Sequence, residues 1–86
     1  MKTKILIVDD ERGIVDMIQS YFQAQYDILT AYSGQEALQK AGNDPDLILL
    51  DINMPDIDGL TVCQKIRDFI TCPILFLTAR IESSDK

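Results

Sequence analysis

The sequence predicts an α/β fold in which a doubly wound parallel sheet carries helices on both faces. Strand-length apolar runs alternate strictly with helix-like segments along all 86 residues, in the order β-α-β-α-β-α-β. The connections between these segments are short, and the runs at residues 4–8 and 47–50 both end directly in acidic residues. Strict alternation of this kind implies parallel strands joined by right-handed crossovers.

The first half of the chain contains two strand–helix pairs. The β-branched run at residues 4–8 predicts the first strand. Helical spacing predicts a helix after it, with a core-facing side formed by Ile14, Met17, Ile18, Tyr21 and Phe22. Residues 26–31 predict the second strand, and the capping-box pattern from Ser33 to Glu36 begins a helix that runs to about Ala41.

The second half contains two more strands and one more helix. Residues 42–45, Gly-Asn-Asp-Pro, end the second helix, and the short apolar run at 47–50 is typical of a strand buried on both faces. Asp58 is expected to cap the third helix. Leu60, Cys63 and Ile66 are the apolar residues of that helix. Residues 74–78 predict the last strand, and residues 83–86 have the composition of a helix start.

Composition limits the function classes. The formal net charge is −6 and the basic residues do not cluster, so we expect no direct binding to nucleic acid. No apolar run is long enough to cross a membrane, which favours a cytoplasmic protein with one domain at residues 1–86. The chain contains no His, which excludes Ser-His-Asp and Cys-His catalysis, and Cys63 and Cys72 are expected to be unpaired thiols.

Three carboxylates are expected to meet at the carboxyl edge of the sheet, where open α/β sheets bind ligands: Asp9, Asp10 and Asp51. They repel one another, and Mg²⁺, which prefers oxygen ligands, is the simplest neutralising partner. A carboxylate beside Mg²⁺ is a competent nucleophile for phosphoryl transfer. Alternatively, Asp9 and Asp10 merely cap the following helix. We interpret Asp56 as a solvated loop acid.

Three motifs together resemble the receiver domain of two-component response regulators. They are Ile-Leu-Ile-Val-Asp-Asp-Glu at 5–11, Leu-Ile-Leu-Leu-Asp-Ile-Asn-Met-Pro-Asp-Ile-Asp-Gly at 47–59, and Ile-Leu-Phe-Leu-Thr-Ala-Arg at 74–80. The last motif is most similar to the DNA-binding transcription-factor branch. The resemblance implies a flavodoxin-like sheet with strand order 2-1-3-4, in which the family's fifth strand and fifth helix are missing.

The resemblance also implies residue roles. Asp51 would accept a phosphoryl group from a sensor histidine kinase. Asp10 and Asp51 would ligate Mg²⁺, Asn53 would contribute its backbone carbonyl, and Asp9 would support the ion. Thr78 would be the switch hydroxyl that bonds the transferred phosphoryl group.

Receiver domains of this family continue with a strand that ends in a phosphoryl-contacting Lys, so the resemblance implies a C-terminally truncated receiver without an effector domain. An unpaired fourth strand favours association, most simply a two-fold homodimer, which sedimentation velocity would test. An inert, self-associating fragment that keeps the metal cradle but cannot be productively phosphorylated is an alternative to the signalling phospho-acceptor. A weaker one is a haloacid-dehalogenase-like Mg²⁺-dependent phosphohydrolase, which would need an acid where Asn53 stands.

Overall fold

The computed structural model describes residues 2–52, 54–68 and 70–77. Its helices and strands follow the predicted order. They are β1 (Lys4–Val8), α1 (Arg12–Phe22), β2 (Asp27–Ala31), α2 (Gly34–Ala41), β3 (Leu47–Asp51), α3 (Gly59–Arg67) and β4 (Ile74–Leu77). Strand β2 begins one residue later than predicted. The predicted helix start at 83–86 lies outside the described residues.

The strands form one parallel sheet in the order β2-β1-β3-β4, which confirms the predicted fold and strand order. Strand β1 is central, with Val8 in register with Ala31 on one side and with Leu50 on the other. The carboxyl ends of β1 and β3 therefore lie next to each other at one edge of the sheet. This register decides where the acidic residues meet.

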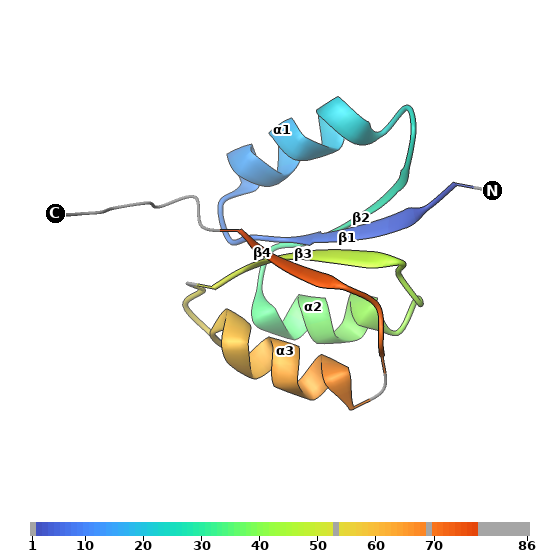
Figure 1. Ribbon diagram of the computed structural model, residues 1–86. Coiled ribbons are helices and arrows are strands. Elements are labelled where there is room, and N and C mark those ends of the chain that lie inside the picture. Colours follow the sequence, from blue (N-terminus) through green and yellow to red (C-terminus); the bar gives the residue numbers. More distant parts are fainter. Residues whose placement is uncertain (1, 53, 69, 78–86) are drawn as a thin grey trace, which may run out of the picture.

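Helices cover both faces of the sheet, as the alternating pattern predicts: α1 lies on one face, and α2 and α3 lie side by side on the other (Figure 1). The main core fills the space between the sheet and the α2–α3 pair. Its strand residues alternate in sequence, because successive side chains of a strand point to opposite faces. The fully buried members include Leu6, Val8, Ile48, Leu50, Ala37, Val62 and Ile66.

The face under α1 has a smaller core, in which Ile5, Ile7 and Val15 are buried. Two residues predicted to face the core do not: the side chains of Met17 and Tyr21 are 64% and 79% exposed. The helix meets the sheet through the side centred on Val15, so residues 17 and 21 lie on the flank of the apolar stripe. This part of the prediction was wrong because the apolar stripe of α1 is wider than the side of the helix that contacts the sheet.

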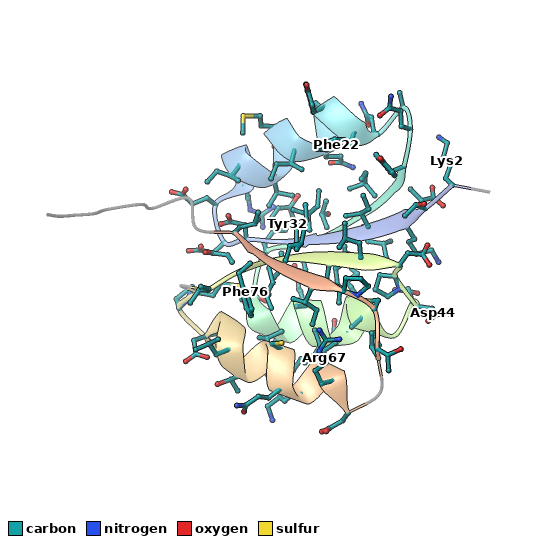
Figure 2. The ribbon with its side chains drawn as sticks, viewed as in Figure 1. Lys2, Phe22, Tyr32, Asp44, Arg67 and Phe76 are labelled. Atoms are coloured by element: carbon teal, nitrogen blue, oxygen red, sulfur yellow. The ribbon has the colours of Figure 1, made fainter. Side chains whose placement is uncertain are left out.

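Helix α1 packs on β1 and β2. The other half of this sheet face, formed by β3 and β4, is more open. Leu47 and Leu49 of β3, predicted to be buried on this face, are only partly buried. Leu75, which is in register with Leu49 on β4, is 55% exposed. Its neighbour Phe76 lies on the opposite, α3 side of the sheet and is 39% exposed (Figure 2).

The helix starts agree with the capping patterns in the sequence. Ser33 Oγ accepts a hydrogen bond from the Glu36 amide at 3.2 Å, and Asp58 Oδ1 accepts one from the Thr61 amide at 2.8 Å. The Glu36 carboxylate accepts its return bond from the amide of Tyr32, one residue before the cap, at 2.7 Å. Helix α1 differs, because its N-cap is Glu11, which makes no side-chain capping bond.

Candidate metal and phospho-acceptor site

Asp9 and Asp10 follow β1 directly. The Asp9 amide donates to the Ala31 carbonyl at 3.1 Å, which continues the β1–β2 pairing one residue beyond the strand. The Asp9 side chain is only 2% exposed, and its Oδ1 accepts a hydrogen bond from the Glu11 amide at 2.9 Å. This bond turns the chain toward α1 and holds the Asp9 carboxylate at the sheet edge, so that neither acid takes the N-cap position of α1.

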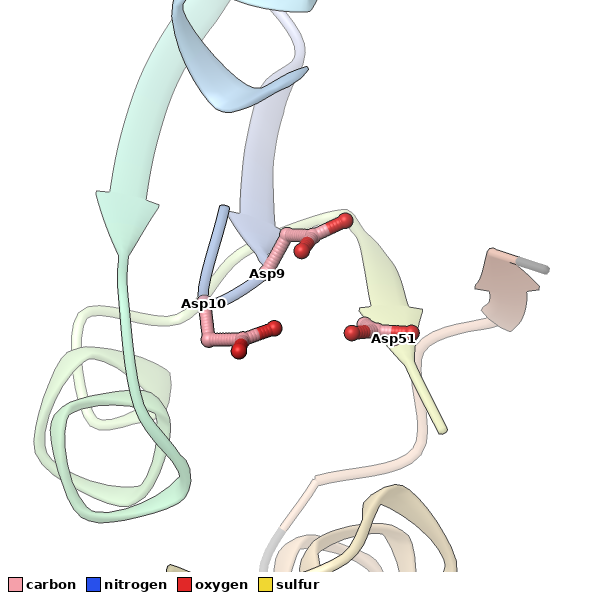
Figure 3. Close-up of side chains that lie close together, drawn as sticks. All are labelled: Asp9, Asp10 and Asp51. Carbon is pink, nitrogen blue, oxygen red and sulfur yellow. The ribbon is translucent and has the colours of Figure 1, made fainter. Parts of the chain in front are cut away.

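Asp51 is the last residue of β3 and is 6% exposed. Because Val8 pairs with Leu50, Asp51 ends β3 beside the point where Asp9 leaves β1. One carboxylate oxygen from each of Asp9, Asp10 and Asp51 lies within 4.8 Å of the others. Figure 3 shows the three carboxylates converging from the two strand ends. The structure thus brings together the acidic trio that the sequence predicts.

The electrostatics of the cluster are unfavourable without a cation. Burial raises the pKa of Asp9, and the charges of Asp51, Asp10 and Glu11 raise this pKa further, against the opposing effect of the Glu11 amide. Among the described residues, no hydrogen-bond donor reaches the buried oxygens Asp9 Oδ2 and Asp10 Oδ1. A buried carboxylate oxygen without a donor is costly. A hard cation with oxygen ligands fits these atoms and the spacing of the trio.

The raised pKa of Asp9 predicts a pH-dependent stability in metal-free buffer. Between the unfolded value of 3.8 and the higher folded value, the folded state binds more protons than the unfolded state. The contribution of Asp9 to the free energy of unfolding therefore falls as pH rises through its folded pKa. Asp9→Asn keeps an acceptor for the Glu11 amide and removes this titration. In urea titrations with a chelator present, the free energy of unfolding of Asp9→Asn relative to that of the parent should therefore increase as pH rises. A difference that stays constant with pH would contradict this expectation.

The loop from β3 to α3 returns closely past Asp51. Its residue Met54 is buried in the main core, and the Gly59 amide donates to the Ile52 carbonyl at 2.8 Å. A Cβ atom at Gly59 would lie 2.7 Å from Ile52 Cα and would press on the Asp51 carbonyl oxygen. Only glycine permits this approach, so Gly59 supports the backbone that carries Asp51.

Asp56 lies in the same loop and corrects the prediction of a merely solvated acid. Its carboxylate is exposed but accepts hydrogen bonds from the Gly34 amide at 3.0 Å and the Gln35 amide at 3.1 Å. These amides, the bond from Gly34 above all, lower the pKa of Asp56. The contact bridges 22 residues of sequence and joins the β3–α3 loop to the start of α2. The sequence contained no signal for it, because an Asp in a loop has many potential partners.

Arg12 and Tyr32 form another contact between loops at this edge. The Arg12 guanidinium lies 4.1 Å from the centroid of the Tyr32 ring, which is a cation–π distance. The contact joins the start of α1 to the β2–α2 connection. Sequence reasoning gave Tyr32 no role, because a lone aromatic in a connection is compatible with either packing or exposure.

Two predicted site residues, Asn53 and Thr78, lie outside the described residues. Their predicted roles, a backbone carbonyl ligand and a switch hydroxyl, stay predictions. Cys63 and Cys72, predicted to be unpaired thiols, are free and partly buried. Burial raises the pKa of the Cys72 thiol, which keeps it protonated and unreactive near neutral pH.

A hollow of about 340 Å³ lies at the opposite, amino edge of the sheet, far from the acidic trio. It is lined by Lys2, Lys4, Asp27, Asp44 and Asp46. Two of these residues are hydrogen-bonded to each other: Asp46 Oδ2 accepts a hydrogen bond from the Lys4 amide at 2.9 Å. The ammonium of Lys4 donates to the Asn43 carbonyl at 2.9 Å. We interpret this hollow as a structural feature, formed where the starts of β1, β2 and β3 lie together.

The open parallel sheet and the cluster of carboxylates at its carboxyl edge agree with the class of protein that the sequence motifs predict, a receiver domain. Residues 5–86 match the family model of the response regulator receiver domain. The chain therefore belongs to the response regulator receiver domain family, as the three sequence motifs predict.

The curated relatives include transcriptional regulatory proteins and response regulators. The chain is 47% identical over 89 residues to the alkaline phosphatase synthesis transcriptional regulatory protein PhoP of Bacillus subtilis strain 168. It is 44% identical over 88 residues to the regulatory protein VanR of Enterococcus faecium. Both alignments include all of this chain, which spans only 37% and 38% of the respective relatives.

Solved structures show the same fold. A two-component response regulator from Clostridium difficile superposes with a TM-score of 0.84 at 39% identity, over 87% of this chain and 64% of that chain. A CheY-like receiver domain protein from Methanospirillum hungatei JF-1 gives a TM-score of 0.79 at 27% identity, over 88% of this chain and 65% of that chain. Within the described part of the chain, no helix combines the length and apolar character that crossing a membrane requires.

Proposed function

We propose that residues 1–86 act as one receiver module, in which Asp51 accepts a phosphoryl group from a sensor histidine kinase in a Mg²⁺-dependent reaction. The observation that carries this proposal is the acidic trio: one carboxylate oxygen of each residue lies within 4.8 Å of the others, at the carboxyl edge of a receiver-family fold. The module is a signalling phospho-acceptor, and its chemistry is regulatory rather than metabolic.

In the proposed metal site, Asp10 and Asp51 provide side-chain ligands, Asn53 provides its backbone carbonyl, and Asp9 supports the ion. The fit rests on the donorless buried oxygens of Asp9 and Asp10 and on the preference of Mg²⁺ for carboxylates. When bound, the ion neutralises the carboxylates and the negative charge of the incoming phosphoryl group. Asp9 keeps its second oxygen on the Glu11 amide and so holds its orientation.

In the transfer step, a carboxylate oxygen of Asp51 attacks the phosphorus of the kinase phosphohistidine. The new oxygen–phosphorus bond forms as the phosphorus–nitrogen bond breaks, and the leaving imidazole keeps the bonding electron pair and takes a proton from solvent. The position of Asp51 at the end of β3 suits this role, because a strand end is rigid yet faces the sheet edge. We propose that the hydroxyl of Thr78 then donates to a phosphoryl oxygen.

The output is proposed from the relatives. PhoP and VanR are named as regulatory proteins, PhoP as a transcriptional one, and this chain corresponds to just over a third of their length. We propose that phosphorylation of this module switches transcription in a longer protein. The net charge of −6 favours an indirect effect over DNA contact by the module itself. A cytoplasmic location and a homodimer stay predictions; the exposed side chains of Leu75 and Phe76, on opposite faces of β4, support association.

The test is intact-mass spectrometry after incubation with Mg²⁺ and a small-molecule phosphodonor, with Asp51→Asn in parallel. The parent should gain the mass of one phosphoryl group, no gain should occur when a chelator is present during the incubation, and Asp51→Asn should gain none. Asp27→Asn, a charge-matched change at the amino edge, should behave like the parent. Magnesium binding without an adduct on folded parent protein would overturn the proposal in favour of an inert fragment that keeps the metal cradle.

A further inference from the structure

Asp56 joins the loop that leaves the acidic site to a neighbouring connection of the sheet. Its two carboxylate oxygens accept from two consecutive backbone amides, Oδ1 from Gly34 at 3.0 Å and Oδ2 from Gln35 at 3.1 Å. These amides belong to the first turn of α2, where helical N–H groups have no intrahelical acceptor. A carboxylate in this position also interacts favourably with the positive end of the helix dipole.

The apolar residue beside Asp56 makes the same connection. A Cβ atom at Gly34 would lie 2.8 Å from Ile57 Cβ and 3.1 Å from the Ile57 carbonyl oxygen, so the loop backbone packs directly on the start of α2. Substitution at Gly34 would separate the two segments. The paired hydrogen bonds of Asp56 and the close packing of Ile57 on Gly34 therefore both hold the loop against the start of α2.

The loop is held at each of its ends as well. At one end it continues from Asp51, the last residue of β3, and Met54 is buried in the core. At the other end, the Gly59 amide bonds to the Ile52 carbonyl at 2.8 Å. Asp56 lies between Met54 and Gly59. Its hydrogen bonds to α2 therefore hold the middle of the loop whose first residues follow Asp51 directly.

We propose that Asp56 is a positioning residue for the acidic site. By accepting hydrogen bonds from the first amides of α2, it holds the β3–α3 loop in the conformation in which Asp51, together with Asp9 and Asp10, binds a divalent cation. This inference rests on the proposed function, because the property that Asp56 controls is the cation affinity of the proposed site. The hydrogen bonds that Asp56 accepts come from the first amides of α2. Asp56 acts through the backbone of the loop.

The test compares the Mg²⁺ affinity of Asp56→Ala and Asp56→Asn with that of the parent by NMR titration of the amides of residues 9–11, at a temperature where all proteins are folded. Asp56→Ala removes both acceptors, and we expect its Kd for Mg²⁺ to rise about tenfold, the range typical of residues that orient metal ligands. Asp56→Asn retains one acceptor for the Gly34 amide. We therefore expect an intermediate rise in Kd.

Asp58→Asn is the matched control. It removes the same charge from the same loop, but its carboxylate caps α3 by accepting from the Thr61 amide rather than binding α2. We expect Asp58→Asn to lower the melting temperature while the Kd for Mg²⁺ stays within about twofold of the parent value, well below the change expected for the positioning residue. If Asp56→Ala does not fold, Asp56→Asn decides the question.

A metal-free measurement separates this inference from the proposed function. In the parent, the amide shifts of Gly34 and Gln35 should titrate with Asp56, at a pKa below 3.8, and Asp56→Asn should abolish that titration. If this contact is present and the Kd for Mg²⁺ is the same in parent and variants, Asp56 has only a structural role and the inference is overturned. If the parent shows no Mg²⁺ response, the proposed metal site fails, and the inference fails with it.

Discussion

Gly59→Ala is expected to destabilise the protein by more than about 3 kcal/mol, because the new methyl group has no space. It would lie 2.7 Å from Ile52 Cα and against the Asp51 carbonyl oxygen, and both of these obstacles are backbone atoms. A side chain could rotate away from such a contact, whereas a strand end that pairs with its neighbour cannot. For a chain of 86 residues, this loss is a large share of a total stability of about 4–13 kcal/mol.

Urea denaturation of two glycine variants measures this effect against a matched control. Gly13→Ala changes a glycine inside α1 whose added Cβ meets no atom within 4 Å. It should stabilise the protein by about 0.5–1 kcal/mol, since alanine loses less backbone entropy in a helix. Equal effects of the two substitutions would show that the close approach of Gly59 to Asp51 does not exist in solution. If Gly59→Ala still folds, its Mg²⁺ response should also be weakened.

Asp10→Asn is expected to have opposite effects with and without Mg²⁺. Without the ion, it removes one of the charges that raise the pKa of Asp9, so the protein should become more stable, by about 1 kcal/mol at low ionic strength. With Mg²⁺ at a hundred times its Kd, the parent should gain about 2.7 kcal/mol from binding. Loss of a ligand should raise the Kd about a hundredfold or more, which leaves the variant a gain of about 0.4 kcal/mol.

Thermal melts with Mg²⁺ and with a chelator distinguish these outcomes. Asp16→Asn is a suitable control, because Asp16 is an exposed acid on α1 outside the trio. It should leave the Mg²⁺ gain unchanged, and salt should screen any effect that it has on stability. A full Mg²⁺ gain in Asp10→Asn would remove Asp10 from the proposed ligand set. Reduced stability of this variant in chelator would contradict the repulsion inferred among the three carboxylates.

The sequence allowed the fold to be predicted because its signals are local. Alternating apolar runs, the capping pattern at Ser33 and the N-cap at Asp58 depend on neighbouring residues alone, and the structure confirms them. The acidic trio was predictable for a related reason. Parallel strands begin and end together, so acids that follow two central strands must meet at one edge.

The sequence misled where a prediction depended on which neighbour covers a surface. Helical spacing identified the apolar side of α1, but Met17 and Tyr21 are exposed because the sheet contacts only the side centred on Val15. Similarly, β3 has the composition of a strand buried on both faces. Its residue Leu49 is nevertheless only partly buried, since α1 packs on β1 and β2.

By itself, the sequence determined the order of the elements, the strand ends that carry Asp9, Asp10 and Asp51, and the family, because periodicity, turn residues and motifs are written along one chain. Only the tertiary structure decided the contacts between connections: Asp56 on the amides of α2, Arg12 on Tyr32, and Gly59 against the backbone of Asp51. Such contacts join residues that are distant in sequence, and each side chain has many conceivable partners. The partner is chosen by strand order and register, which place particular connections side by side at the sheet edge.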